Sequence, residues 1–286
     1  MDTENFDVLI ESKQGAFTSQ FKELPKYKDL IFLFVKREFV SKYKQTALGP
    51  LWAIIQPLLT TVIITFVFGN LAGLGPEGVP SFVFFFAGTF LWSYFSSCLT
   101  ATSNTFISNR SILGKVYFPR LIMPISTVLS QMISLAIQYV MFLAFDLFYY
   151  FTGQNVALNW FVLMTPVAFF QLALLALGCG IVISAMTTKY RDMAMLVPFL
   201  TEIWRYLSPV AYDMFGMGAI APGGRYYWLY MLNPISPIVN TFRYAYLGIG
   251  SIDWLYYGIS WCETVVIFFI GVIMFNRVER TFMDTI

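Results

Sequence analysis

The sequence predicts an all-α integral membrane protein, on three observations. Of its 286 residues, 58% are hydrophobic and only 12% are charged, whereas a soluble domain carries about 25% charged residues. Four long stretches contain no charged residue at all, namely 45–76, 78–109, 121–145 and 147–188, and a membrane-spanning helix needs about 20 mostly apolar residues. These stretches do not alternate apolar and polar residues as barrel strands do, so we expect helices.

The N-terminal part is expected to stay outside the lipid. Residues 1–23 form a polar segment without the apolar core of a removable signal peptide, which favours a cytoplasmic N-terminus. Residues 24–286 form the predicted transmembrane domain, and it opens with an amphipathic helix at the membrane interface over residues 24–46. Spacings of three and four put five side chains of this helix on one apolar face: Tyr27, Leu30, Ile31, Phe34 and Val35. We expect this face to enter the lipid while the lysines stay near anionic headgroups, and Gly49-Pro50 to end the helix.

Six membrane spans follow from the apolar stretches and the residues that interrupt them. The stretch 147–188 is too long for one helix, and the polar residues 152–159 divide it. The predicted spans lie near residues 51–72, 80–101, 121–149, 160–186, 193–215 and 254–276. An even number of spans places both termini on the same side of the membrane.

The lysines and arginines predict which side that is. With the N-terminus inside, fifteen of the eighteen basic residues fall in inner segments, including the clusters at 13–44, 110–120, 189–191 and 277–280. Basic residues favour the cytoplasmic side of a membrane. Both termini are therefore predicted to be cytoplasmic.

The segment 216–253 differs from a simple outer loop. Its apolar pieces are about ten to fifteen residues long and are interrupted at Asn233-Pro234 and Ser236-Pro237, which is too short to span a membrane. We expect short re-entrant or interfacial helices before the last span. Ten aromatic residues lie between Tyr226 and Tyr257, either as an aromatic belt at the outer interface or as a gate, for which the candidates are Tyr227, Trp228 and Tyr230.

Several kinds of chemistry are excluded by the residues that the chain lacks. It has no histidine, and its three cysteines, Cys98, Cys179 and Cys262, lie far apart in apolar stretches. Zinc sites and histidine-dependent catalysis are therefore not expected, and no metal is predicted. There is also no GxxxxGK[ST] phosphate-binding loop. If ATP drives this protein, another chain must bind and hydrolyse it.

Two groups of charged residues are candidates for a site. Arg37, Lys42 and Lys44, with Tyr43 among them, directly precede the first span, and they either anchor the topology or bind an anionic lipid-linked substrate. Glu202 and Arg205 are three residues apart within the predicted fifth span. They share one helix face, as a structural ion pair or as part of a pore wall.

Four stretches together resemble one protein family. They are KDLIFLFVKREFVSKYKQTALGPLWAIIQP (28–57), NRSILGKVYFPRLIMP (109–124), TTKYRDM (187–193) and LNPISPIVNTFRYAYLG (232–248). In this order they are similar to type-2 ABC exporter permeases, and in particular to the branch that exports O-antigen, capsule and teichoic acid.

The resemblance implies a concrete function. Two copies would pair as a homodimer around a pore in the bacterial plasma (inner) membrane. The substrate would be a polysaccharide on undecaprenyl diphosphate, moved outward during lipopolysaccharide or teichoic-acid biosynthesis, and no nucleic acid is expected as a partner. A separate ATPase subunit would bind ATP and Mg, so this chain would carry no cofactor. Its docking surface would be the inner loop 102–120, with the candidate residues Arg110, Lys115, Tyr117, Phe118 and Arg120.

Three other functions stay open at this point. Within the exporter class, the substrate is alternatively a drug or a small lipid. An ion-coupled carrier would not need ATP, but no internal repeat is visible in the sequence, which weighs against it. A membrane glycosyltransferase would need acidic residues or metal ligands at one face of the membrane, whereas the acidic residues here are scattered.

Overall fold

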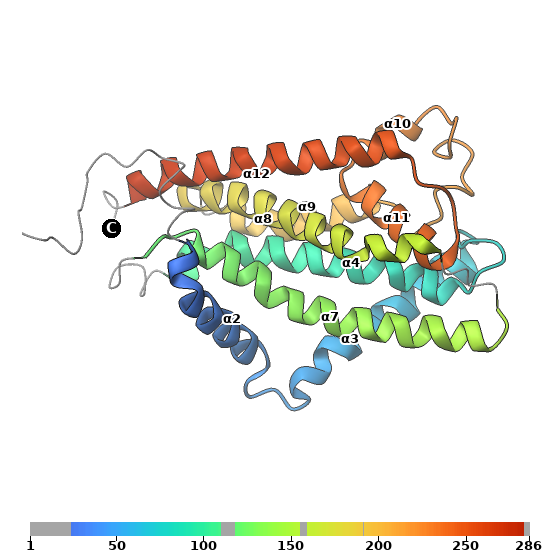
Figure 1. Cartoon of the computed structure of the whole chain (residues 1–286), viewed down its shortest axis with the longest axis horizontal. Helices are drawn as coiled ribbons and strands as arrows, with labels where there is room; N and C mark the ends of the chain where they lie inside the picture. Colours follow the sequence, from blue (N-terminus) through green and yellow to red (C-terminus); the bar gives the residue numbers. More distant parts are fainter. Residues whose placement is uncertain (1–23, 110–117, 155–158, 191, 283–286) are drawn as a thin grey trace, which may run out of the picture.

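The computed structural model describes residues 24–109, 118–154, 159–190 and 192–282, and over these residues its regular secondary structure is helical throughout. Figure 1 shows the long helices side by side along the molecule. In chain order the elements are η1 Leu24–Tyr27, α2 Lys28–Tyr43, η2 Gly49–Leu51, α3 Trp52–Ile64, η3 Thr65–Leu71 (a π-helical continuation of α3), α4 Ser81–Ser103, α5 Thr105–Ser108, α7 Ile122–Phe151, η4 Trp160–Met164, α8 Thr165–Lys189, α9 Met193–Tyr206, α10 Tyr227–Met231, α11 Ile235–Leu247 and α12 Trp254–Phe282.

Five of the six predicted spans correspond to helices that are long and apolar enough to cross a membrane. These helices cover Gly49–Leu71, Ser81–Ser103, Ile122–Phe151, Trp160–Thr187 and Trp254–Arg277. Their bounds differ from the predicted ones by one or two residues, because proline, glycine and polar turns mark most of the ends. The protein is therefore a multi-pass, all-α membrane protein.

The fifth predicted span, 193–215, is only partly helical. Helix α9 has 14 residues and ends at Tyr206, so it is about 21 Å long against about 30 Å for the hydrocarbon core. The helix stops there because Pro209 follows, and proline disfavours helical geometry at the residue before it. The predicted bound at residue 215 is wrong, and the count of six spans stays a prediction.

The chain nevertheless passes along the molecule between α8 and α10. At one end, the Thr187 hydroxyl donates to the Ser103 carbonyl (2.6 Å), which joins the ends of α8 and α4. At the other end, the backbone N–H of Asn159 donates to the Ala245 carbonyl (2.9 Å), which joins the start of η4 to α11. Figure 1 places α10 and α11 at the second end and α2 at the first. The short helices of segment 216–253 are thus confirmed, and they lie together at one end of the bundle.

Helix α4 lies at the centre of the bundle. Of the most apolar part of α4, 78% is buried inside the protein, whereas for the first span this share is only 22%. Every residue from Val83 to Leu91 is buried, and Phe86 and Phe90 pack among rings of α7, α8 and α11. The phenylalanines of stretch 82–95 consequently form part of the hydrophobic core.

Helix α2 packs on the protein with the face that we expected to enter the lipid. Leu30, Ile31 and Phe34 pack in a cluster with residues of α7, α8 and α12, and Phe34 lies 5.8 Å from Phe118 between ring centroids. The exposed apolar side chains of α2 are instead Phe32, Leu33 and Val40. The expectation for the apolar face is therefore wrong, because a neighbouring protein surface covers it.

Helix α2 also ends earlier than predicted. It stops at Tyr43, and Lys44 takes an extended backbone conformation. Gln45 has a positive φ of 65°, which turns the chain. Gly49-Pro50 does not end α2 but opens the next helix, since a proline in the first helical turn needs no hydrogen bond from its nitrogen.

Candidate functional site

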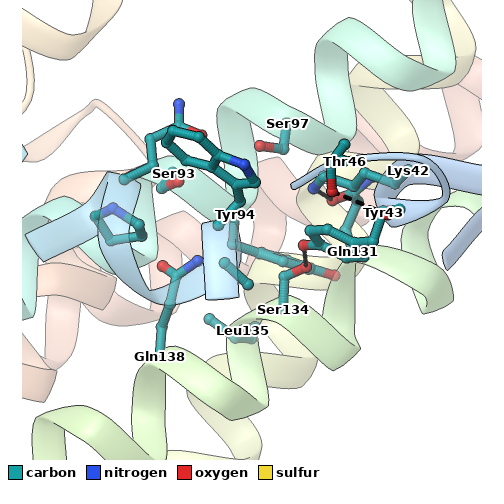
Figure 2. Close-up of a pocket in the computed structure, with 14 residues that line it drawn as sticks. Lys42, Tyr43, Thr46, Ser93, Tyr94, Ser97, Gln131, Ser134, Leu135 and Gln138 are labelled. Atoms are coloured by element: carbon teal, nitrogen blue, oxygen red, sulfur yellow. Dashed lines mark hydrogen bonds between the residues drawn. The ribbon is translucent and has the colours of Figure 1, made fainter. Parts of the chain in front are cut away.

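A cavity of about 280 Å³ lies where α2 turns into the first span. Its walls come from the end of α2, the turn after it, and helices α3, α4 and α7. Figure 2 shows the side chains of α4 and α7 meeting those of the turn across this space. The lining residues are Lys42, Tyr43, Thr46, Trp52, Ala53, Gln56, Pro57, Ser93, Tyr94, Ser97, Gln131, Ser134, Leu135 and Gln138.

Hydrogen bonds fix the end of α2 against α7. The Tyr43 and Ser134 hydroxyls are 3.3 Å apart, and the ammonium of Lys42 donates to the Gln131 side-chain oxygen at 3.1 Å. The Thr46 hydroxyl donates back to the Tyr43 carbonyl at 2.9 Å, which holds the turn. These contacts place one positive charge and several hydroxyls around the same space.

The cavity lies at membrane depth and is polar. Ser97 is six residues before the end of α4, which is about 9 Å along the helix axis. Ten of the fourteen lining side chains carry a hydroxyl, an amide or an ammonium group. Polar groups within a membrane protein are expensive and normally serve a function, so this cavity is the candidate site.

Of the four residues predicted at this turn, the structure brings two to the cavity. Lys42 and Tyr43 line it. Arg37 instead donates to the Asn109 side-chain oxygen at 2.8 Å and lies over the Phe34 ring at 4.8 Å, whereas Lys44 is exposed and does not line the cavity.

Glu38, next to Arg37 on α2, is a partly buried acid outside the spans. Its carboxylate accepts a hydrogen bond of 2.8 Å from the Thr127 hydroxyl of α7. Burial raises the pKa of Glu38, against the opposing effects of this hydrogen bond and of the Arg37 charge. The folded protein therefore holds the Glu38 proton more tightly than the unfolded chain does.

This raised pKa predicts a pH-dependent effect of Glu38→Gln. The stabilisation from the protonated acid is fully present below the unfolded pKa of about 4.3 and is lost as the pH rises through the raised folded-state pKa. Thermal unfolding in detergent should therefore show the variant gaining stability relative to the wild type between pH 5 and pH 8. The exposed Glu77→Gln is the control, with no change at either pH. A Glu38→Gln variant that loses stability at pH 8 would contradict the assignment.

Glu202 and Arg205 form the predicted ion pair on α9. Their charged atoms, Oε2 and Nη1, are 3.3 Å apart. The Glu202 side chain is 57% exposed, and Phe199, Ile203 and Tyr206 beside it are exposed as well. The pairing is confirmed, and it lies on a surface of the single chain that nothing in the described residues covers.

The three aromatic candidates of the outer segment have different surroundings. The Tyr227 hydroxyl donates to Asp253 at 3.1 Å, and Tyr230 meets Tyr212 edge to face. Trp228 is exposed. The structure thus ties two of the three rings to the packing of this end, and their role as a gate stays a prediction.

The predicted docking loop is described only in part. Arg110, Lys115 and Tyr117 lie outside the described residues. Phe118 is buried against Phe34, and Arg120 is only 6% exposed. Phe118 and Arg120 therefore pack within this chain and do not offer a free docking surface.

The sequence comparisons decide the family. The family model described as "ABC-2 type transporter" matches residues 29–247. This range is most of the chain, and it includes all the residues that line the cavity. The chain belongs to the ABC-2 type transporter family. Since members of this family are the membrane subunits of transporters, this ABC-2 chain is a permease and not an enzyme, and it works with an ATPase partner.

Curated relatives of the ABC-2 chain match it over most of its length. The O-antigen export system permease protein RfbA of Klebsiella pneumoniae is 25% identical over 259 residues, covering 90% of this chain and 94% of the relative. A protein of the same name from Myxococcus xanthus is 25% identical over 223 residues, covering 78% and 82%. The polysialic acid transport protein KpsM of Escherichia coli is 23% identical over 256 residues, covering 87% and 93%.

Sequence reasoning missed the half of the ABC-2 chain's cavity that α4 and α7 provide. Gln131, Ser134 and Gln138 are spaced by three and four residues, so they form one polar stripe on α7 within an apolar span. This spacing was visible in the sequence. What the sequence did not show is that the stripe faces Tyr43 and Lys42.

Proposed function

We propose that this chain is the transmembrane subunit of an ATP-driven exporter that moves an undecaprenyl-diphosphate-linked polysaccharide outward across the bacterial plasma membrane. The observation that carries the proposal is the match, over 78–90% of the chain, to permeases named for O-antigen export and polysialic acid transport. The polar cavity beside Lys42 supports it, because it offers a polar site at membrane depth. An exporter of drugs or small lipids is the alternative.

The exposed ion pair of α9 supports a homodimer around a pore. A charged side chain facing lipid costs about 2.5–3.5 kcal/mol or more, and Glu202 is exposed in the single chain. The cost disappears if Glu202 and Arg205 face water or a second subunit. A second copy of the chain against α9 would create such a water-filled path, along which sugar hydroxyls would exchange weak hydrogen bonds.

The ATPase subunit, with its ATP and Mg, is proposed to dock on the inner loop. Because Phe118 and Arg120 are buried, the proposed contacts with the ATPase are the other three candidates of the inner loop, Arg110, Lys115 and Tyr117. The buried pair gives the loop a connection into the bundle instead, since Phe118 touches α2 through Phe34.

Cytoplasmic termini and a plasma-membrane location are part of the proposal, and cysteine labelling tests the topology. Cys262 is the exposed native cysteine, whereas Cys98 and Cys179 are buried, so Cys262→Ala provides the background. Tyr190→Cys should react only from the cytoplasm, and Gly218→Cys only from outside. Gly218 is suitable because an added Cβ meets nothing within 4 Å, whereas at Gly224 it would meet the Gly218 carbonyl at 2.5 Å. Reaction of Tyr190→Cys with an impermeant reagent on intact cells would reverse the topology.

Deleting the gene tests the function in the cell. The proposal predicts that surface polysaccharide is lost and that lipid-linked polysaccharide accumulates on the inner side of the membrane. Restoring the wild-type chain should reverse both effects. Normal surface polysaccharide together with increased sensitivity to drugs would favour the alternative exporter.

A further inference from the structure

The cavity at the end of α2 has a composition suited to a sugar joined to a phosphate. Among the described residues that line it, Lys42 alone is charged, and the other polar lining groups are neutral hydroxyls and amides. A diphosphate alone, with two or more negative charges, would find a single cation here. A sugar ring instead offers several hydroxyls, each of which can donate and accept a hydrogen bond.

One amide in the cavity is left without a partner. Gln138 of α7 is only 5% exposed, and its side-chain oxygen makes no hydrogen bond within the described residues. Figure 2 shows this side chain extending from α7 into the cavity. A buried polar group without a partner costs about 1–3 kcal/mol, so a donor from a bound molecule would remove this cost.

The cation and the free amide lie at different places on the wall. Lys42 lies in the last helical turn of α2 and is exposed, and its ammonium donates to the Gln131 side-chain oxygen. Gln138 lies seven residues, about two helical turns, further along α7 than Gln131. A molecule that reaches both would have an anionic group at the mouth and a hydroxyl or acetamido group inside.

We propose that this cavity binds the lipid-proximal sugar of the exported polysaccharide, with the phosphate of its lipid carrier against Lys42 and the sugar against Gln138. The proposal rests on the proposed function and deepens it by locating a sugar subsite within one protomer. It makes the transporter recognise the sugar next to the lipid, in addition to the lipid phosphate.

The test uses the complete complex of this chain and its ATPase in nanodiscs of phosphatidylcholine. Three probes are compared by binding titration: undecaprenyl diphosphate carrying one hexosamine, undecaprenyl diphosphate without sugar, and phosphatidylglycerol. Gln138→Leu should weaken binding of the sugar-bearing probe about fivefold and leave the sugarless probe unchanged, as expected for one lost hydrogen bond. Lys42→Gln should weaken both diphosphate probes about tenfold. Lys36→Gln, an exposed lysine of α2 that does not line the cavity, should change neither.

Folding is controlled in the same samples. Because the Gln138 oxygen has no hydrogen-bond partner in the part of the chain that the structure describes, Gln138→Leu should not lower the melting temperature, and Gln138→Met is a second variant of similar length. Equal weakening of both diphosphate probes by Gln138→Leu, or no weakening, would overturn the sugar subsite. Phosphatidylglycerol that competes as well as the sugar-bearing probe would also overturn it in favour of a general phospholipid site. A wild-type complex that binds neither diphosphate probe would instead refute the proposed function.

Discussion

Replacing Gly178 with valine is expected to prevent α8 and α12 from packing and to cause a large loss of folded protein. A Cβ at Gly178 would lie 2.8 Å from the Cα of Phe268 and 2.9 Å from its nitrogen. These are backbone atoms, which cannot rotate away as a side chain can. Small residues let membrane helices approach closely, and here Gly271 of α12 approaches the Gly178 carbonyl in return.

The size of the effect follows from the rigidity of the contact. Overpacking a core costs about 1–3 kcal/mol when side chains can adjust, and a collision with backbone should reach the upper end of that range. The measurement is the yield of monodisperse protein after detergent extraction. Gly258→Ala on α12 is the matched control, because nothing lies within 4 Å of a Cβ there. Equal yields for Gly178→Val and Gly258→Ala would contradict this packing.

Replacing Arg243 with methionine is expected to release the outer segment from the bundle. Arg243 of α11 is buried, lies 3.7 Å over the Phe84 ring and donates to the carbonyls of Pro209 and Val210, the latter at 2.9 Å. It therefore joins α11, α4 and the chain after α9. Each buried carbonyl left unpaired costs about 1–3 kcal/mol, so losing both should cost about 2–6 kcal/mol.

Limited proteolysis of the purified protein measures this release. Cleavage within segment 207–226 should become much faster in Arg243→Met, while cleavage elsewhere stays slow. Arg225→Met is a control on the same segment, because Arg225 is exposed. An unchanged cleavage pattern in Arg243→Met would show that this arginine does not hold the segment.

The fold could be predicted well wherever composition decides it. A lipid environment forces apolar stretches into helices, and proline and polar turns mark where they end, so five spans agree with the structure within one or two residues. The ends depend on local chemistry, and this caused the errors: Pro209 ends α9 early, and Gln45, with its positive φ, ends α2 before Gly49-Pro50.

The candidate site was harder to predict because it depends on contacts between distant residues. Lys42 and Tyr43 were found from charge and position. Arg37 was grouped with them because it is near in sequence, yet it turns to Asn109. The apolar face of α2 has the same pattern whether lipid or protein covers it, so only the structure could show that it packs on the bundle.

Reconstituted transport tests the central claim most directly. The chain and its ATPase would be placed in liposomes with an undecaprenyl-diphosphate-linked glycan. A glycan-cleaving enzyme would then be added on the face of the membrane opposite the ATPase, so that it cleaves only glycan that has been transported to that face. The account predicts that cleavage requires ATP and both subunits and persists with an ionophore present. Two results would contradict it. One is cleavage that is independent of ATP and is abolished by the ionophore. The other is a complex that transfers no glycan but hydrolyses ATP to move a drug or small lipid.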